Sequence, residues 1–256
     1  MIENACHIKR GRFQINTFLK RLIFGALSLS LTIPAYAGNF SVTPVRIYMT
    51  PNDKAVAVTI NNQGDDDLVM QADVYSWSQT PDGKDELTLT DDLLLSPPII
   101  KLAGKSRQVV RLARLTRMKP DRQITYRLVV REIPEARPVK DRVQLQLALA
   151  FSMPVFITPR GAKSNLVCSA ERTSASSVSA ACENTGTAYA QPLDFVLSNS
   201  VGEKLASRDS GGYILPTIKR KFDIKSAGKR IPGGKATLTV RLDDGSKQTF
   251  DVTLSE

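Results

Sequence analysis

The feature that most constrains the fold is an alternation of apolar and polar residues with a period of two. It recurs in short runs such as residues 55–60, 68–77, 108–113 and 125–131, which are separated by Gly, Pro, Asn and Asp. A period of two places alternate side chains on opposite faces of a β-strand, and regularly spaced short strands are typical of sandwiches and barrels. No segment has a sustained period of 3.6 with capping residues, so we expect little helix. The sequence therefore predicts an all-β protein.

The chain has an internal break that divides these strands into two sets. Residues 158–163 combine Pro and Gly with charged residues and have the composition of a linker. A second set of strands begins near Asn165, and its last two are joined by the hairpin turn at 243–246. We therefore predict two β-sandwich domains joined by a short linker, the first at residues 38–159 and the second at 160–256.

The N-terminus has the three parts of a secretory signal peptide. Residues 1–21 contain five basic residues and one acidic residue, residues 22–33 are apolar, and Ala35-Tyr-Ala37 resembles a cleavage site. The alternative is a membrane anchor, but the apolar run is shorter than the roughly 20 residues that span a bilayer. We expect cleavage after Ala37 and export as a protein that is not embedded in the membrane.

Removal of residues 1–37 changes which functions the composition permits. It takes away five bases and one acid, so the formal charge falls from +10 to +6, and it removes the only histidine. The remaining Lys and Arg residues are scattered, whereas a nucleic-acid site would cluster them, so we expect no nucleic-acid partner. Without imidazole, a metal centre or a Cys/His nucleophile lacks its usual groups, and we expect neither a metal nor a cofactor.

The two cysteines that remain after cleavage are Cys168 and Cys182. A closely spaced, even set of cysteines in an exported protein indicates a disulfide, so we predict a bond between them. The segments 166–168 and 178–183 flank a stretch rich in Ser and Thr, which we interpret as a turn. The disulfide would then join neighbouring strands of the second domain.

Several motifs follow one another in a characteristic order along the first predicted domain. They are Phe40-Ser-Val-Thr-Pro-Val-Arg46, the Asn61-Asn62 turn, Trp77, residues 96–104 with 108–111, Tyr126-Arg-Leu128 with residues 131–134, and Pro154-Val-Phe156 with Pro159. Their order resembles the periplasmic chaperones of the chaperone–usher pathway of pilus assembly, well over the first domain and only loosely over the second. The resemblance implies two immunoglobulin-like domains, a place in the periplasm, no enzymatic activity, and two kinds of partner, the fimbrial subunits and an outer-membrane usher.

The resemblance also implies that one strand of the first domain is lent to a subunit. Subunits of such fibres lack their final strand and expose an apolar groove, which a donated strand can fill. The donor would run through residues 141–153, where the odd positions from Val143 to Phe151 are apolar and the even positions from Gln144 to Ser152 are polar or small. From the pattern alone, the apolar face could equally cover the protein's own core. The resemblance favours subunit binding by Val143, Leu145, Leu147, Leu149 and Phe151.

A second expected subunit contact is a basic site for the subunit's C-terminal carboxylate. By the resemblance, Arg46 holds this carboxylate, since a guanidinium matches both oxygens. The family also places a basic residue near the end of the donor strand, but here that position is Pro154. Arg111 and Lys101 are candidate substitutes for the missing base, and an ordinary surface position remains the alternative for Arg46.

Two rival functions remain open at this point. A secreted fibre subunit or adhesin with immunoglobulin-like domains is one, although such a subunit usually has a single domain with an N-terminal extension to donate. An exported hydrolase is the other, but the chain lacks a recognisable nucleophile motif. An assembly chaperone fits the two domains and the internal donor strand better than either.

Overall fold

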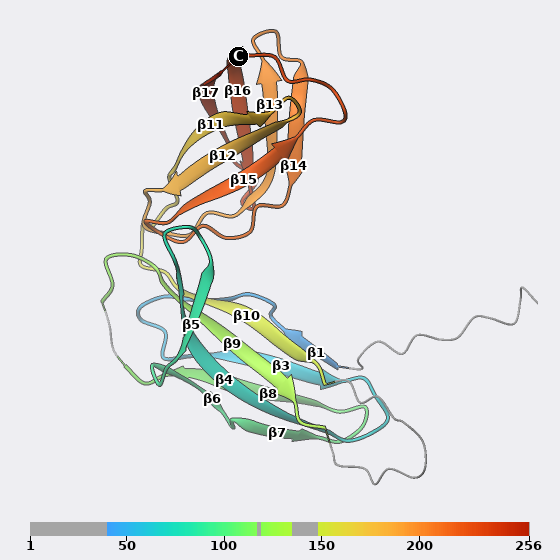
Figure 1. The fold of residues 1–256 in the computed structure, drawn as a ribbon. Helices are drawn as coiled ribbons and strands as arrows, with labels where there is room; N and C mark the ends of the chain where they lie inside the picture. Colours follow the sequence, from blue (N-terminus) through green and yellow to red (C-terminus); the bar gives the residue numbers. More distant parts are fainter. Residues whose placement is uncertain (1–39, 117–118, 135–147, 256) are drawn as a thin grey trace, which may run out of the picture. The chain divides into compact units, whose positions relative to one another are not determined.

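The computed structural model describes residues 40–116, 119–134 and 148–255, and every regular element in these ranges is a β-strand (Figure 1). The prediction of an all-β protein is confirmed. None of the described residues forms a helix long and apolar enough to cross a membrane. The predicted signal peptide at residues 1–37 lies outside the described residues.

The first ten strands form two sheets. A four-stranded sheet has the order β1-β3-β8-β6, and a six-stranded sheet has the order β2-β10-β9-β4-β5, with β7 also pairing β4. All pairs are antiparallel except β2 with β10, which is parallel. The strands are β1 (Phe40–Thr43), β2 (Ile47–Met49), β3 (Ala55–Asn62), β4 (Leu68–Gln79), β5 (Asp85–Leu89), β6 (Leu93–Ser96), β7 (Ile99–Leu102), β8 (Arg107–Arg114), β9 (Ile124–Glu132) and β10 (Ala150–Ile157).

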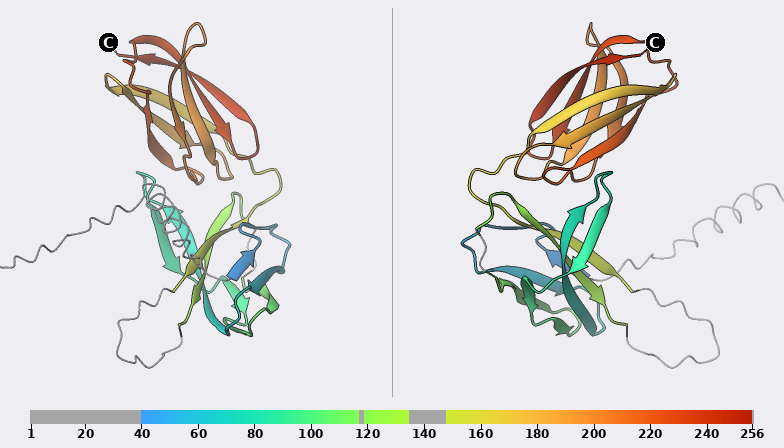
Figure 2. Two further views of the ribbon diagram at one scale, coloured as in Figure 1. Left: turned by 90° about the vertical axis from the view of Figure 1, so that its right-hand side faces the viewer. Right: turned by 60° about the vertical axis from the view of Figure 1, so that its left-hand side comes forward.

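The last seven strands form one continuous antiparallel sheet of order β11-β12-β15-β14-β13-β16-β17. Its two edges meet, because β11 contacts β17 and the amide of Leu166 donates to the side chain of Gln248. Strands β11, β12 and β15 cross the others and form a second layer (Figures 1 and 2). The strands are β11 (Leu166–Ser174), β12 (Ser177–Asn184), β13 (Pro192–Asn199), β14 (Lys204–Asp209), β15 (Lys219–Lys225), β16 (Gly234–Leu242) and β17 (Lys247–Leu254).

Each set of strands encloses its own apolar core. The first core is built by buried side chains between Phe40 and Ile157, and the second by buried side chains between Leu166 and Leu254. The alternation explains both, because every second residue is buried throughout β12 and from Val58 onwards in β3. Two separate cores joined by the short segment 158–165 are the two β-sandwich domains that the sequence predicts.

Some predicted boundaries differ from the structure. The donor strand was predicted at residues 141–153. In the structure strand β10 begins at Ala150, and residues 141–147 lie outside the described part of the chain. The stretch after Cys168 is not a long turn, because β11 and β12 continue to a tight connection at Ala175 and Ser176. Ser and Thr are compatible with strands as well as turns, and here the cross-strand pairing decides.

The predicted disulfide between Cys168 and Cys182 is confirmed. The two residues are direct cross-strand partners in β11 and β12, and their sulfur atoms are bonded. Cys182 is fully buried in the second core. The disulfide therefore fixes the pairing of two strands at the edge of the second domain.

A buried asparagine organises the loops at one end of the second domain. The side-chain amide of Asn184 is fully buried and donates to the carbonyls of Ala188 (2.7 Å) and Ile214 (3.0 Å). Its carbonyl oxygen accepts from the amides of Asn165 (3.2 Å) and Gly186 (3.0 Å). One side chain thus satisfies four backbone groups, three of which lie in loops.

We expect Asn184→Ala to lower the free energy of unfolding by roughly 3 kcal/mol, because several buried backbone groups lose their partner. Chemical denaturation of the purified protein measures this change. The same substitution at the exposed Asn52 is the matched control and should stay within about 0.5 kcal/mol of the parent. Equal stability of the two variants would show that water replaces the asparagine side chain.

Candidate functional site

Strand β10 has one paired edge and one edge that is only partly covered. Along its whole length it pairs with β9, from Ala150 opposite Arg131 to Ile157 opposite Ile124. On the other side β2 pairs only with residues 155–157. Among the described residues no strand lies against residues 150–154 on that side, and we call this stretch the open edge.

Two amides of the open edge point away from β9. The amide of Glu132 donates to the carbonyl of Leu149 (2.8 Å), so odd-numbered residues of β10 direct their backbone groups toward β9. Even-numbered residues direct theirs to the other side, as the bond from the amide of Thr158 to the carbonyl of Met49 shows. Ala150 and Ser152 therefore offer N–H and C=O groups to an additional strand.

The odd-numbered side chains of β10 pass from the first core toward the surface. Val155, Ile157 and Met153 are buried in that core, and Leu149 is half-buried against it. Phe151 is 37% exposed, and its ring meets that of Phe40 edge to face. The other predicted subunit-binding residues, Val143, Leu145 and Leu147, lie outside the described residues.

Arg46 lies where the open edge ends. It directly precedes β2, whose first residue, Ile47, is the partner of Val155. Its guanidinium Nη1 forms an ion pair of 2.8 Å with Oδ2 of Asp243, a residue of the turn between β16 and β17. A strand added alongside the open edge in the direction of β10 would therefore reach Arg46 with its C-terminal end.

Several polar groups keep Arg46 charged and fixed. Burial alone would lower the pKa of Arg46, but Tyr48, Tyr213 and Asp243 outweigh it and raise that pKa. The hydroxyls of Tyr48 and Tyr189 lie 2.8 Å apart, and the hydroxyl of Tyr189 donates to Asp243 (3.1 Å). Burial raises the pKa of Tyr189, so its hydroxyl remains a donor at neutral pH.

A second arginine lies beside Pro154, the position at which the resemblance leads us to expect a basic residue. Arg127 of β9 is the cross-strand partner of Pro154. Its guanidinium carbon lies 3.8 Å from the ring centre of Trp77, and its Nη2 lies 3.6 Å from Asp85. Burial lowers the pKa of Arg127, which Asp85 partly offsets. Its guanidinium is nevertheless a charged group at neutral pH.

Aromatic rings join the two arginines into one site. The guanidinium carbons of Arg46 and Arg127 each lie 5.7 Å from the ring centre of Tyr213. Trp77 is buried in an apolar cluster with Phe156 and Leu215, separate from both domain cores. The single tryptophan is thus a buried residue of the contact between the domains and not of the first core.

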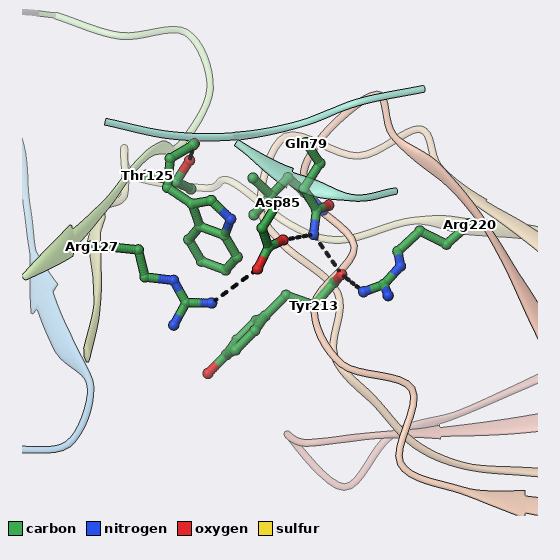
Figure 3. A network of polar contacts seen from close by, with 8 residues as sticks. Gln79, Asp85, Thr125, Arg127, Tyr213 and Arg220 are labelled. Atoms are coloured by element: carbon green, nitrogen blue, oxygen red, sulfur yellow. Dashed lines mark hydrogen bonds and ion pairs between the residues drawn. The ribbon is translucent and has the colours of Figure 1, made fainter. Parts of the chain in front are cut away.

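A polar network fixes one side of this site (Figure 3). The side chain of Gln79 donates to Asp85 (2.8 Å) and to the carbonyl of Tyr213 (3.1 Å), and it accepts from the amide of Leu215 (3.0 Å). The carbonyl of Tyr213 also accepts from Arg220 (2.8 Å). In Figure 3, Arg127 and Arg220 approach from opposite sides of Gln79 and Tyr213.

The two predicted substitutes for the missing base lie elsewhere. Lys101 is exposed on β7 opposite Val69, six residues along β4 from Tyr75, the cross-strand partner of Arg127, which amounts to about 20 Å. Arg111 is exposed on the four-stranded sheet, opposite Ala57. Among the described residues, the groups that interact with Arg46 are Tyr48, Tyr213 and Asp243.

Sequence reasoning did not single out Arg127, which lies beside Pro154, or Asp243, which pairs with Arg46. Arg127 lies inside the motif Tyr126-Arg-Leu128, but its closeness to Pro154 depends on the register of β9 and β10. Asp243 lies 197 residues from Arg46 in a turn that the sequence does predict. In the described ranges, no group of three or more His, Cys, Asp or Glu residues could hold a metal ion.

The fold and the site define a protein of two β-sandwich domains with an open strand edge that ends at a pair of arginines. Residues 39–163 match the sequence profile of the pili and flagellar-assembly chaperones, PapD N-terminal domain. This segment of the chain is similar to that family, and the resemblance to pilus assembly chaperones predicted from its motifs is confirmed.

Two curated relatives carry related descriptions. The chain is 34% identical over 151 residues to the uncharacterized fimbrial chaperone YbgP of Escherichia coli K12, covering 56% of this chain and 57% of the relative. It is 28% identical over 130 residues to the probable fimbrial chaperone YadV of the same strain, covering 48% and 51%. The chain thus matches little more than half the length of each relative.

Solved structures support the fold over a longer stretch. A chain of the CsuC–CsuE chaperone–tip adhesion subunit pre-assembly complex from Acinetobacter baumannii is similar with a TM-score of 0.60 and 22% identity. The similarity covers 85% of this chain and 99% of that one. The prediction of two immunoglobulin-like domains is confirmed.

Proposed function

We propose that this protein is a periplasmic chaperone that binds fimbrial subunits by donor-strand complementation. The observation that carries the proposal is the open edge of β10, which ends beside Arg46. An extended segment of a subunit can add to this edge through main-chain hydrogen bonds with Ala150 and Ser152. The descriptions of both curated relatives as fimbrial chaperones support this function.

In this proposal the bound segment runs parallel to β10. Strand β2 already continues the edge beyond residue 154 in a parallel direction, so the bound segment stops where β2 begins. Its C-terminal carboxylate then lies at Arg46, and the forked donors of the guanidinium match both carboxylate oxygens. The apolar side chains of the donor, Phe151 and the predicted residues Leu149, Leu147, Leu145 and Val143, fill the subunit's groove.

Arg127 takes the role of the second base that Pro154 cannot supply. It is the cross-strand neighbour of Pro154 and shares Tyr213 with Arg46. Lys101 and Arg111 lie away from this position and are left out of the site. Two arginines stacked against aromatic rings suit a carboxylate, because arginine is weakly hydrated and its donors are held in one plane.

The remaining steps of the proposed function concern export and delivery. We assign residues 1–37 to a cleaved signal peptide, residues 38–159 to the first domain and residues 160–256 to the second. The chaperone delivers its subunits to an outer-membrane usher. It acts by binding, without catalysis and without a cofactor.

Co-expression with a fimbrial subunit from the same gene cluster tests the proposed function. Affinity purification of the chaperone from a periplasmic extract should recover the subunit, and gel filtration should show a one-to-one complex. A subunit that is equally abundant and soluble without the chaperone would contradict the proposal. Self-polymerisation of this chain would instead identify it as a fibre subunit.

A further inference from the structure

Both arginines of the proposed carboxylate site are already paired with aspartates of the same chain. Arg46 contacts Asp243 at 2.8 Å, and Arg127 contacts Asp85 at 3.6 Å. Side-chain exposure is 34% for Arg46 and 18% for Asp243, so solvent screens their attraction only in part. The site therefore has two positive and two negative charges and is close to neutral before any ligand binds.

We propose that Asp243 competes with the ligand for Arg46 and masks the carboxylate site until a subunit displaces it. This inference rests on the proposed function, because it assumes that the ligand presents a terminal carboxylate to Arg46. A second carboxylate could use the other donors of Arg46, but beside Asp243 it would be repelled, since like charges that share one guanidinium repel each other. Binding therefore exchanges one carboxylate for another.

The contacts of Asp243 make this exchange feasible. Asp243 uses one oxygen, Oδ2, and one guanidinium nitrogen, Nη1, whereas a ligand that enters along the open edge can engage two donors of the fork. After displacement, Asp243 still accepts a hydrogen bond from the hydroxyl of Tyr189, so it is not left without a partner. The exchange thus replaces a single contact with a bidentate one.

The exchange has a consequence for the contact between the domains. Arg46 precedes β2 of the first domain, and Asp243 belongs to the turn after β16 in the second, so their ion pair connects the two. Ligand binding removes this connection, whereas the bonds of Gln79 with Tyr213 and Leu215 are independent of Arg46 and remain. Asp243 therefore couples occupancy of the carboxylate site to one of the links between the domains.

Calorimetric titration with a synthetic peptide tests the inference. The probe is a twelve-residue peptide of alternating valine and threonine with a free C-terminal carboxylate, and the reference is the same peptide with a C-terminal amide. We expect Asp243→Asn to lower the Kd for the carboxylate peptide roughly tenfold and to leave the amide peptide unchanged. Asp244→Asn removes the same charge one residue away, at an exposed position, and should change neither Kd by more than about twofold.

The outcomes separate this inference from the proposed function. If Arg46→Ala abolishes the preference for the carboxylate peptide but Asp243→Asn binds it no more tightly than the parent does, Asp243 is not a competitor and the inference is wrong. If the parent protein itself shows no preference for the carboxylate over the amide, the proposed carboxylate site is wrong. Asp243→Ser, with its smaller neutral side chain, repeats the test should Asp243→Asn unfold.

Discussion

Arg46→Ala is expected to weaken subunit capture by about 2–5 kcal/mol, which corresponds to a loss of roughly 30-fold to several thousand-fold in affinity. The substitution removes the guanidinium and leaves the terminal carboxylate of the subunit without its partner in a partly desolvated site. Much of the cost arises from this stranded charge and not from the net value of the pair. Co-purification of the subunit with each variant measures the effect.

Two further variants separate the role of Arg46 from general effects. Arg46→Lys should also be defective, because an ammonium group cannot match both carboxylate oxygens. Arg122→Ala removes an exposed arginine whose only described partner is the adjacent Asp121, and it should capture subunits normally. Both alanine variants should melt within a few degrees of the parent, since partly exposed ion pairs contribute at most about 1 kcal/mol. Normal capture by Arg46→Ala would remove Arg46 from the site.

Phe151→Glu is expected to abolish capture while the protein stays folded. Phe151 is the described apolar residue of the donor segment that faces solvent, at 37% exposure. A carboxylate placed in the apolar groove of a subunit has no partner there and costs several kcal/mol. In the unbound chaperone the same carboxylate faces water, and the main loss is the contact with Phe40, worth about 1 kcal/mol. Gel filtration of co-expressed complexes measures capture.

The adjacent residue supplies a matched control. Ser152→Glu introduces the same charge one position along β10, where the side chain is exposed and points to the opposite face of the strand. It should retain capture. Equal loss in both variants would mean that the donor does not use one face, and retained capture in both would exclude Phe151 from the interface.

Most strands of the fold could be predicted because they follow a simple alternation. In β3 and β9 the apolar positions recur at every second residue, and in the structure these residues form the first core. Such strands have one face on the core and the other in solvent, so the pattern in the sequence corresponds directly to burial. Pro44 lies between β1 and β2, and proline lacks the amide that would continue a strand ladder.

Other strands were not predicted because their composition resembles that of loops. All residues of β5 are exposed, so no buried face imposes an alternation on Asp85–Leu89. In β15 the outward positions are charged, and only Phe222 and Ile224 are buried. These segments become strands because they pair with neighbouring strands. A single sequence does not show which segments pair.

Residues of the candidate site could be predicted only where a local sequence motif contains them. Arg46 was assigned from the motif that contains it, and it does lie at the end of the open edge. The sequence offered Lys101 and Arg111 as candidates for the second base, and the structure brings a further arginine, Arg127, next to Pro154. The closeness of Arg127 to Pro154 depends on the register of β9 and β10. The contact of Asp243 with Arg46 depends on the packing of a turn that lies 197 residues further along the chain.

Hydrogen exchange at Ala150 and Ser152 tests the central claim most directly. In the unbound protein these amides point away from β9, so they should exchange rapidly, while the amides of Phe151 and Met153 are bonded to β9 and exchange slowly. A donated strand makes new hydrogen bonds at the open edge. Binding of a subunit should therefore slow exchange at Ala150 and Ser152 at least about tenfold and leave Phe151 little changed. Unchanged rapid exchange of Ala150 and Ser152 in a stable complex would show that the subunit binds elsewhere.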